Sequence, residues 1–81
     1  MAQPKRVKLA GGVRVDLCYD ERGFHCRWHP HFPKCMNRAL LRRYKIARDA
    51  FMAEVSLTHG SVMLADGEGI QVFKDGHKLA V

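Results

Sequence analysis

Residues 36 to 60 read MNRALLRRYKIARDAFMAEVSLTHG, the longest stretch of the chain with helical spacing of apolar residues. Asn37 is suited to cap the start of a helix and Gly60 to end one. We therefore predict a helix from about Arg38 to Thr58. At about 1.5 Å per residue it would be roughly 30 Å long, so the rest of this small chain has to be organised around it.

Two separate apolar groups appear when these residues are placed at helical intervals. The core face is predicted to hold Leu40, Leu41, Tyr44, Ala47, Phe51, Met52 and Val55. A second flank holds Ala39, Ile46, Ala50, Ala53 and Leu57, separated from the first by Arg43 and Glu54, and the remaining arc holds Arg38, Arg42, Lys45 and Asp49. The second flank either joins the core, if strands pack on the helix from two sides, or stays exposed and docks on another chain.

Strand-like segments lie on both sides of the helix. Those before it are 5–9, 13–19 and 24–28, and those after it are 61–65, 70–73 and 77–81. Turn sequences separate them, namely Gly11-Gly12, Asp20-Glu21-Arg22-Gly23, Asp66-Gly67-Glu68-Gly69 and Lys74-Asp75-Gly76. The predicted fold is α+β in the order βββαβββ, with one or two antiparallel sheets on a single helix, and residues 1–81 are expected to form a single domain.

The first three strands alternate apolar and polar residues. Alternation places Val7, Leu9, Val13, Val15, Leu17, Tyr19, Phe24, Cys26 and Trp28 on one face, and Arg6, Lys8, Arg14, Asp16, Cys18, His25 and Arg27 on the other. One face is therefore expected to be core and the other basic.

The composition restricts the class of protein. The 81 residues are 47% hydrophobic, with a formal net charge of +6 and three cysteines. The charge favours an acidic partner. The odd cysteine count agrees with a reducing compartment. No apolar run is long enough to cross a membrane, and the first residues lack a secretion signal, so we expect a cytoplasmic protein without membrane contact.

Residues 25–35 are rich in thiol and imidazole groups, which suit zinc. Alternation directs Cys26 away from Cys18 and His25, and no Cys-x-x-Cys pair is present, so no metal site is predicted. A loop site formed by His29, His31 and Cys35 is left open. Because no nucleophile, base and orienting group occur together in a recognisable motif, we expect neither an enzyme nor a cofactor.

The order of three strands and a helix, in VRVDLCYDERGFHCRW and ALLRRYKIARDAFMAEV, resembles the arm-site DNA-binding domains at the N-terminus of phage integrases. In that family the sheet lies in the DNA major groove. The resemblance covers about 50 residues and implies that Arg14, His25 and Arg27 contact DNA. The Pro-rich loop and the last three strands depart from the family pattern.

In its overall architecture, though in no sequence motif, this small chain with one helix and no recognisable group of catalytic residues is similar to phage-borne inhibitors of bacterial defence, including anti-CRISPR proteins. Such proteins act by covering a surface of a larger nucleoprotein complex. This resemblance implies a protein target.

Two hypotheses follow. In the first, a basic surface binds nucleic acid or a nucleoprotein complex through Arg14, Arg27, Arg38, Arg42, Arg43 and Lys45. In the second, the protein is a phage-encoded inhibitor that docks on a larger protein target of a bacterial defence complex through Trp28, His29, Phe32, Ile46, Ala50 and Leu57. A homodimer through the helix flank is a further alternative. Salt dependence distinguishes the two, because phosphate contacts weaken steeply as salt rises.

Overall fold

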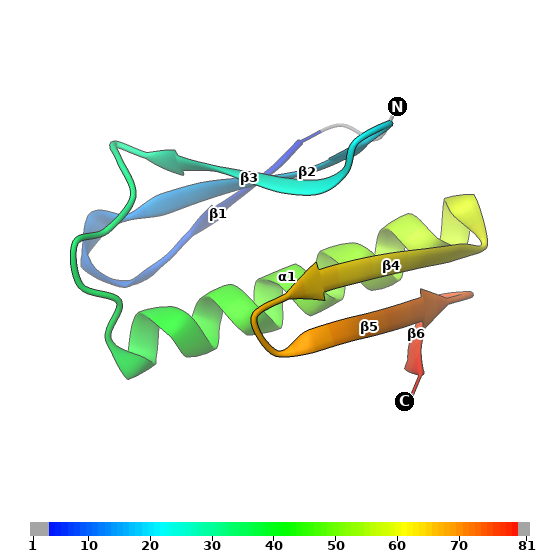
Figure 1. The fold of residues 1–81 in the computed structure, drawn as a ribbon. Coiled ribbons are helices and arrows are strands. Elements are labelled where there is room, and N and C mark those ends of the chain that lie inside the picture. Colours follow the sequence, from blue (N-terminus) through cyan, green and yellow to red (C-terminus); the bar gives the residue numbers. More distant parts are fainter. Residues whose placement is uncertain (1–3, 80–81) are drawn as a thin grey trace. The chain divides into compact units, whose positions relative to one another are not determined.

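The computed structural model describes residues 4–79 and has six strands and one long helix (Figure 1). The elements are β1 (Lys5–Lys8), the 3-10 turn η1 (Ala10–Gly12), β2 (Arg14–Asp20), β3 (Gly23–His29), α1 (Arg38–His59), β4 (Ser61–Asp66), β5 (Gly69–Lys74) and β6 (His77–Leu79). The predicted α+β class and the order βββαβββ are confirmed. Of the last predicted strand, residues 80 and 81 lie outside the described range.

The strands form two separate antiparallel sheets, ordered β1-β2-β3 and β4-β5-β6. The chain divides into two compact units, Met1–Arg48 and Asp49–Val81. The boundary falls inside α1, so each unit contains half of the helix. Whether the two units behave as one domain stays a prediction.

The ends of α1 are set by the two residues that the sequence indicates. Asn37 Oδ1 accepts a hydrogen bond from the Leu40 backbone N–H at 2.9 Å, which satisfies one of the unpaired donors of the first turn. At the other end the Gly60 N–H donates to the Ser56 carbonyl at 2.7 Å, and Gly60 has a φ of +84°. This position requires a left-handed backbone conformation, which glycine adopts without steric cost. The predicted bounds are thus confirmed to within one residue.

The first sheet pairs β1 with β2 and β2 with β3 in one continuous register. Lys8 pairs with Arg14, so the connection from Leu9 to Val13 is longer than the predicted glycine hairpin, although both of its glycines have positive φ. Leu9 is nevertheless buried. The apolar face contains Val15 and Leu17, both fully buried, and the predicted alternation of the two faces is confirmed.

The second sheet directs Val62, Leu64 and Phe73 to a buried face. Ser56 of α1 is fully buried; its hydroxyl donates to the Ala53 carbonyl at 2.7 Å and accepts from the Gly76 N–H at 2.8 Å. Asp75 and Gly76 both have positive φ, as a two-residue hairpin with an Asp-Gly turn requires. In this unit the last hairpin is therefore attached to the helix by a buried serine.

Of the two predicted apolar groups of the helix, only the core face contributes buried side chains. Leu40, Phe51, Met52 and Val55 of the core face are buried. On the second flank Ala39, Ile46, Ala50 and Leu57 are exposed and Ala53 is half-buried. The alternative in which this flank joins the core is therefore wrong. No helix within residues 4–79 is long and apolar enough to span a membrane.

Arg48, which the helical spacing did not assign to any face, is only 4% exposed although it is charged. Its guanidinium carbon lies 5.8 Å from the centre of the Tyr44 ring, within the range of a cation–π contact. The half of α1 that belongs to the first unit therefore buries a cation, Arg48, as well as apolar side chains.

Candidate nucleic-acid interface

The outer face of the first sheet carries cations aligned across its three strands. The register places Lys8, Arg14 and His29 in one row and Arg6, Asp16 and Arg27 in the next. Cys18 and His25 form a third row. The first two rows contain four lysine or arginine residues and one carboxylate, so the face has a positive charge even with its histidines neutral.

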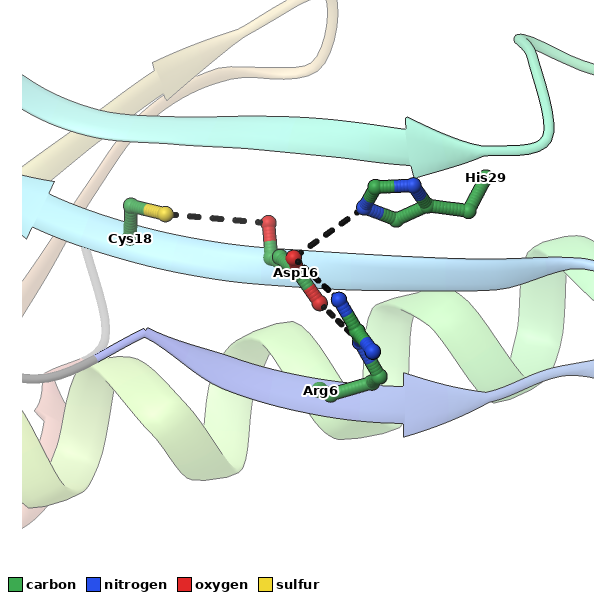
Figure 2. Close-up of polar contacts among 4 residues, drawn as sticks. All are labelled: Arg6, Asp16, Cys18 and His29. Carbon is green, nitrogen blue, oxygen red and sulfur yellow. Dashed lines mark hydrogen bonds and ion pairs between the residues drawn. The ribbon is translucent and has the colours of Figure 1, made fainter.

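Asp16 lies at the centre of this face and joins all three strands (Figure 2). Arg6 donates from Nε to Asp16 Oδ1 at 2.9 Å and from Nη2 to Oδ2 at 3.3 Å. His29 Nε2 lies 3.1 Å from the same Oδ2, and because an ionised carboxylate only accepts hydrogen bonds, the imidazole donates. The carboxylate therefore fixes the positions of two basic side chains on the neighbouring strands.

These contacts lower the pKa of Asp16 to about 2, and the hydrogen bond from Arg6 is the largest cause. Partial burial of the carboxyl acts in the opposite direction, and the His29 hydrogen bond adds to the lowering. Asp16 is therefore ionised throughout the neutral range, where it holds Arg6 and His29 in place.

We expect acid to weaken the fold through Asp16. Because the folded-state pKa lies below the ordinary value of 3.8, the contribution of Asp16 to the free energy of unfolding is complete above about pH 5 and is lost as the pH falls towards 2. The measurement is urea unfolding of the wild type and Asp16→Asn at several pH values. The stability difference should be constant from pH 7 to about 5, fall steeply towards pH 2 and be lost below it. Glu21→Gln, in the adjacent exposed turn, is the control, and a difference independent of pH would contradict the assignment.

Three other cations of the outer face remain available for a ligand. Within residues 4–79, Lys8, Arg14 and Arg27 are exposed and have no ion-pair partner. Beside them is a hollow of about 340 Å³ lined by Pro4, Asp16, Cys18, His25, Cys26 and Arg27. His25, one of the lining residues, has its Nε2 3.7 Å from Asp20 Oδ2. The face thus presents cations next to a recess with an imidazole and a guanidinium on its wall.

No protein-family model, curated protein or solved structure matches this chain. What the site does is therefore inferred from its own residues.

The predicted cations do not share one surface. Tyr44 of α1 contacts residues of the opposite, apolar face of the sheet: its hydroxyl lies 3.5 Å from Cys26 Sγ, and its ring centre lies 5.2 Å from that of Trp28. The helix residues of the prediction are the exposed Arg38, Arg42 and Arg43 and the half-buried Lys45. In the first unit they belong to the side of the sheet away from Arg14 and Arg27, so a single flat ligand cannot contact both sets.

The residues predicted for protein docking are also divided. Trp28 and His29 are neighbours in β3 and so point to opposite faces. Trp28 is half-buried between Tyr44 and Phe32, whose ring centre is 5.3 Å away, whereas His29 contacts Asp16. Phe32 is 62% exposed. Of these three residues only Phe32 is exposed, whereas Trp28 and His29 are half-buried.

The thiols in the first sheet are poorly suited to nucleophilic chemistry. Burial raises the pKa of Cys18, and the nearby Asp16 charge raises it further against the influence of Arg27. Burial likewise raises the pKa of Cys26, although the Tyr44 hydrogen bond opposes it. Both thiols are therefore protonated at neutral pH, whereas reactive cysteines have lowered values.

The described part of the chain also does not gather a metal site. Within residues 4–79 no three His, Cys, Asp or Glu side chains are close enough to hold a metal ion. His29, His31 and Cys35, left open by the sequence, are therefore not brought together, since His29 is directed to Asp16.

Proposed function

We propose that the first unit binds double-stranded DNA in the cytoplasm through the outer face of the β1-β2-β3 sheet. The observation that carries this proposal is the pair of cationic rows on that face, in which Lys8, Arg14 and Arg27 have no carboxylate partner among residues 4–79. Arginine and lysine at the ends of strands can contact phosphates, and arginine can also hydrogen-bond to guanine.

The dimensions of the sheet favour DNA over RNA. Neighbouring strands are about 4.8 Å apart, so β1 and β3 are separated by about 10 Å. The major groove of B-DNA is about 12 Å wide and admits β-ribbons, whereas the major groove of an RNA duplex is too narrow for side chains to enter. The sheet-in-groove arrangement implied by the resemblance to integrase arm-site domains is consistent with this choice.

Asp16 supports the proposal although its charge opposes DNA binding. Its charge is compensated by Arg6, and its hydrogen bonds with Arg6 and His29 reduce the freedom of both side chains before any ligand arrives. Side chains that are already ordered lose less entropy on binding. Arg6 then flanks the available cations with the N–H groups that Asp16 does not use.

The test is fluorescence anisotropy with a labelled 20-base-pair duplex at increasing salt. With three or four phosphate contacts the affinity should fall about 100-fold between 50 and 200 mM salt. The double variant Arg14→Glu/Arg27→Glu should bind about 10- to 100-fold more weakly and show a salt slope smaller by about 2. Neither residue is buried, so the variant should keep the circular dichroism spectrum of the wild type.

Arg42→Glu/Arg43→Glu is the matched control, because it makes the same change of charge at exposed residues of α1. We expect it to keep most of the affinity, losing only long-range attraction. If it abolishes binding while Arg14→Glu/Arg27→Glu does not, the helix and not the sheet is the interface. If neither variant changes the salt slope, the proposed function is wrong.

A further inference from the structure

The loop of residues 30–37, which joins β3 to α1 (Figure 1), presents an aromatic ring to water. Phe32 is 62% exposed, whereas every other phenylalanine, tyrosine and tryptophan among residues 4–79 is buried or half-buried. Trp28 meets the Phe32 ring edge to face, with ring centres 5.3 Å apart. In such a pair the partner covers at most one face of a ring. The other face of Phe32 is therefore open to a planar ligand.

Other rings support Phe32 from behind. Trp28 lies between Phe32 and Tyr44 of α1, whose ring centre is 5.2 Å from that of Trp28. In the sequence Pro30 and Pro33 lie on either side of Phe32, and each restricts the backbone of the loop. A side chain that is already positioned loses less freedom when a ligand binds. The loop therefore offers an ordered aromatic surface.

The chain around this ring contains no acidic residue. From Arg22 to Arg48 there are eight lysine or arginine residues and three histidines, but no aspartate or glutamate. Asp16 belongs to the outer face of the sheet, where it contacts Arg6 and His29. Asp20 and Glu21 lie at the end of β3 that is remote from the loop. In the described part of the first unit, the surroundings of the loop are therefore cationic.

Three exposed cations follow Phe32 in the sequence. Within residues 4–79, Lys34, Arg38 and Arg42 have no ion-pair partner. Lys34 is two residues from Phe32, so their α-carbons are within about 7 Å of one another. Arg38 begins α1 where the loop ends. An open aromatic ring beside available cations is how many proteins bind single-stranded nucleic acid, because bases stack on the ring and phosphates contact the cations.

We propose that Phe32 stacks on an unpaired base of a DNA strand that continues beyond the duplex bound by the outer face of the first sheet. The preferred ligand is then a duplex with a single-stranded extension. Only the duplex part of this inference rests on the proposed function. A base uses both the ring and the cations, whereas an acidic peptide would use the cations alone.

The path of the chain supports this arrangement. The row of Lys8, Arg14 and His29 is the last row of the sheet before the loop. From His29 the loop leads to Phe32, whose contact with Trp28 places it towards the face of the sheet that Tyr44 contacts. A stiff duplex cannot contact both faces of the sheet, but a flexible single strand leaving the duplex can follow the loop.

The test compares three labelled probes by fluorescence anisotropy. They are a blunt duplex of about 20 base pairs, the same duplex with an extension of about eight thymines, and a blunt duplex of about 24 base pairs, which adds as many phosphates as the extension does. We expect the wild type to bind the extended duplex at least fivefold more tightly than either blunt duplex, since one stacked base contributes about 5- to 150-fold.

Phe32→Ala should bind the extended and blunt duplexes equally and keep the wild-type affinity for the blunt ones. Phe32→Leu keeps an apolar side chain without a flat ring and should also lose the gain, whereas Phe32→Trp should retain it. Trp28, the single tryptophan of the chain, gives a second readout. Its emission should change when the extended duplex is added to the wild type and not when a blunt duplex is added.

Two results would overturn the inference. One is equal wild-type affinity for the extended duplex and the longer blunt duplex, and the other is a gain from the extension that survives in Phe32→Ala. Binding of a labelled glutamate decamer more tightly than a thymine strand, weakened by Phe32→Ala, would assign the loop to an acidic peptide instead. If the thymine strand alone binds through Phe32 while no blunt duplex binds, base stacking is supported and the proposed duplex binding is wrong.

Discussion

Phe73→Ala is expected to lower the free energy of unfolding by about 3 to 5 kcal/mol. Among residues 4–79, Phe73 is the largest fully buried side chain, 1% exposed, and it lies on the central strand of the second sheet opposite Val62. Its removal loses both the transfer energy of the ring and the contacts of the side chains around it. A domain of this size has a total stability of only about 5 to 10 kcal/mol, so urea unfolding should show a much lower midpoint.

Phe32→Ala is the matched control for this measurement. It removes the same ring from a site that is 62% exposed, where the main contact is the edge-to-face arrangement with Trp28. Such an aromatic pair contributes about 1 kcal/mol. If the two variants lose similar stability, the burial of Phe73 and the register that directs it inward are wrong.

The elements of this fold could be predicted from the sequence because their signals are local. Asn37 and Gly60 end the helix through contacts made within one turn of themselves. Asp20 and Asp66 each accept a hydrogen bond from the backbone N–H two residues later, at 2.8 and 2.7 Å, and thereby set the turns that follow them. Interactions of this range depend on neighbouring residues alone, so a single sequence contains them.

The central contact of the candidate site could not be predicted in the same way. Asp16, Arg6 and His29 come from three strands, and their meeting depends on the register between strands. Alternation assigned Asp16 to the correct face but could not show which cations it would neutralise. The burial of Arg48 could not be predicted for a related reason. A charged residue is rarely buried unless it is paired, and a partner distant in sequence is not visible in the local pattern.

The second sheet has an apolar outer face, and this face did have a signal in the sequence. It exposes Met63, Ile70 and Leu79. Residues 62–65 are apolar without interruption, and 70–73 contain a single polar residue, Gln71. A strand with one solvated face alternates, whereas an uninterrupted run is typical of a strand covered on both faces. Of the two alternatives left open for the helix flank, the exposed one agrees with Ile46, whereas no exposed apolar surface was predicted for the sheet.

Leu17→Ala is expected to cost a similar amount, about 3 to 5 kcal/mol, in the first unit. Leu17 is fully buried on the central strand β2, where it pairs with Lys5 and Cys26. Leu57→Ala is the control, because it makes the same replacement at a site that is 68% exposed and should cost about 1 kcal/mol or less. The midpoint of urea unfolding, followed by the circular dichroism of α1, which extends through both units, gives both values.

The same variant shows whether the two units unfold together. The 22 residues of α1 are divided between the units, 11 on each side of the boundary, and a helix of 11 residues is marginal by itself. Loss of the first half of α1 should weaken the second half. We therefore expect Leu17→Ala to lower the free energy of opening measured by hydrogen exchange at the β4 and β5 amides by as much as it lowers the free energy of unfolding measured at Trp28. Protection of β4 and β5 at the wild-type level, with Trp28 already unfolded, would instead mean that Asp49–Val81 is stable without the first unit, and the single-domain prediction would be wrong.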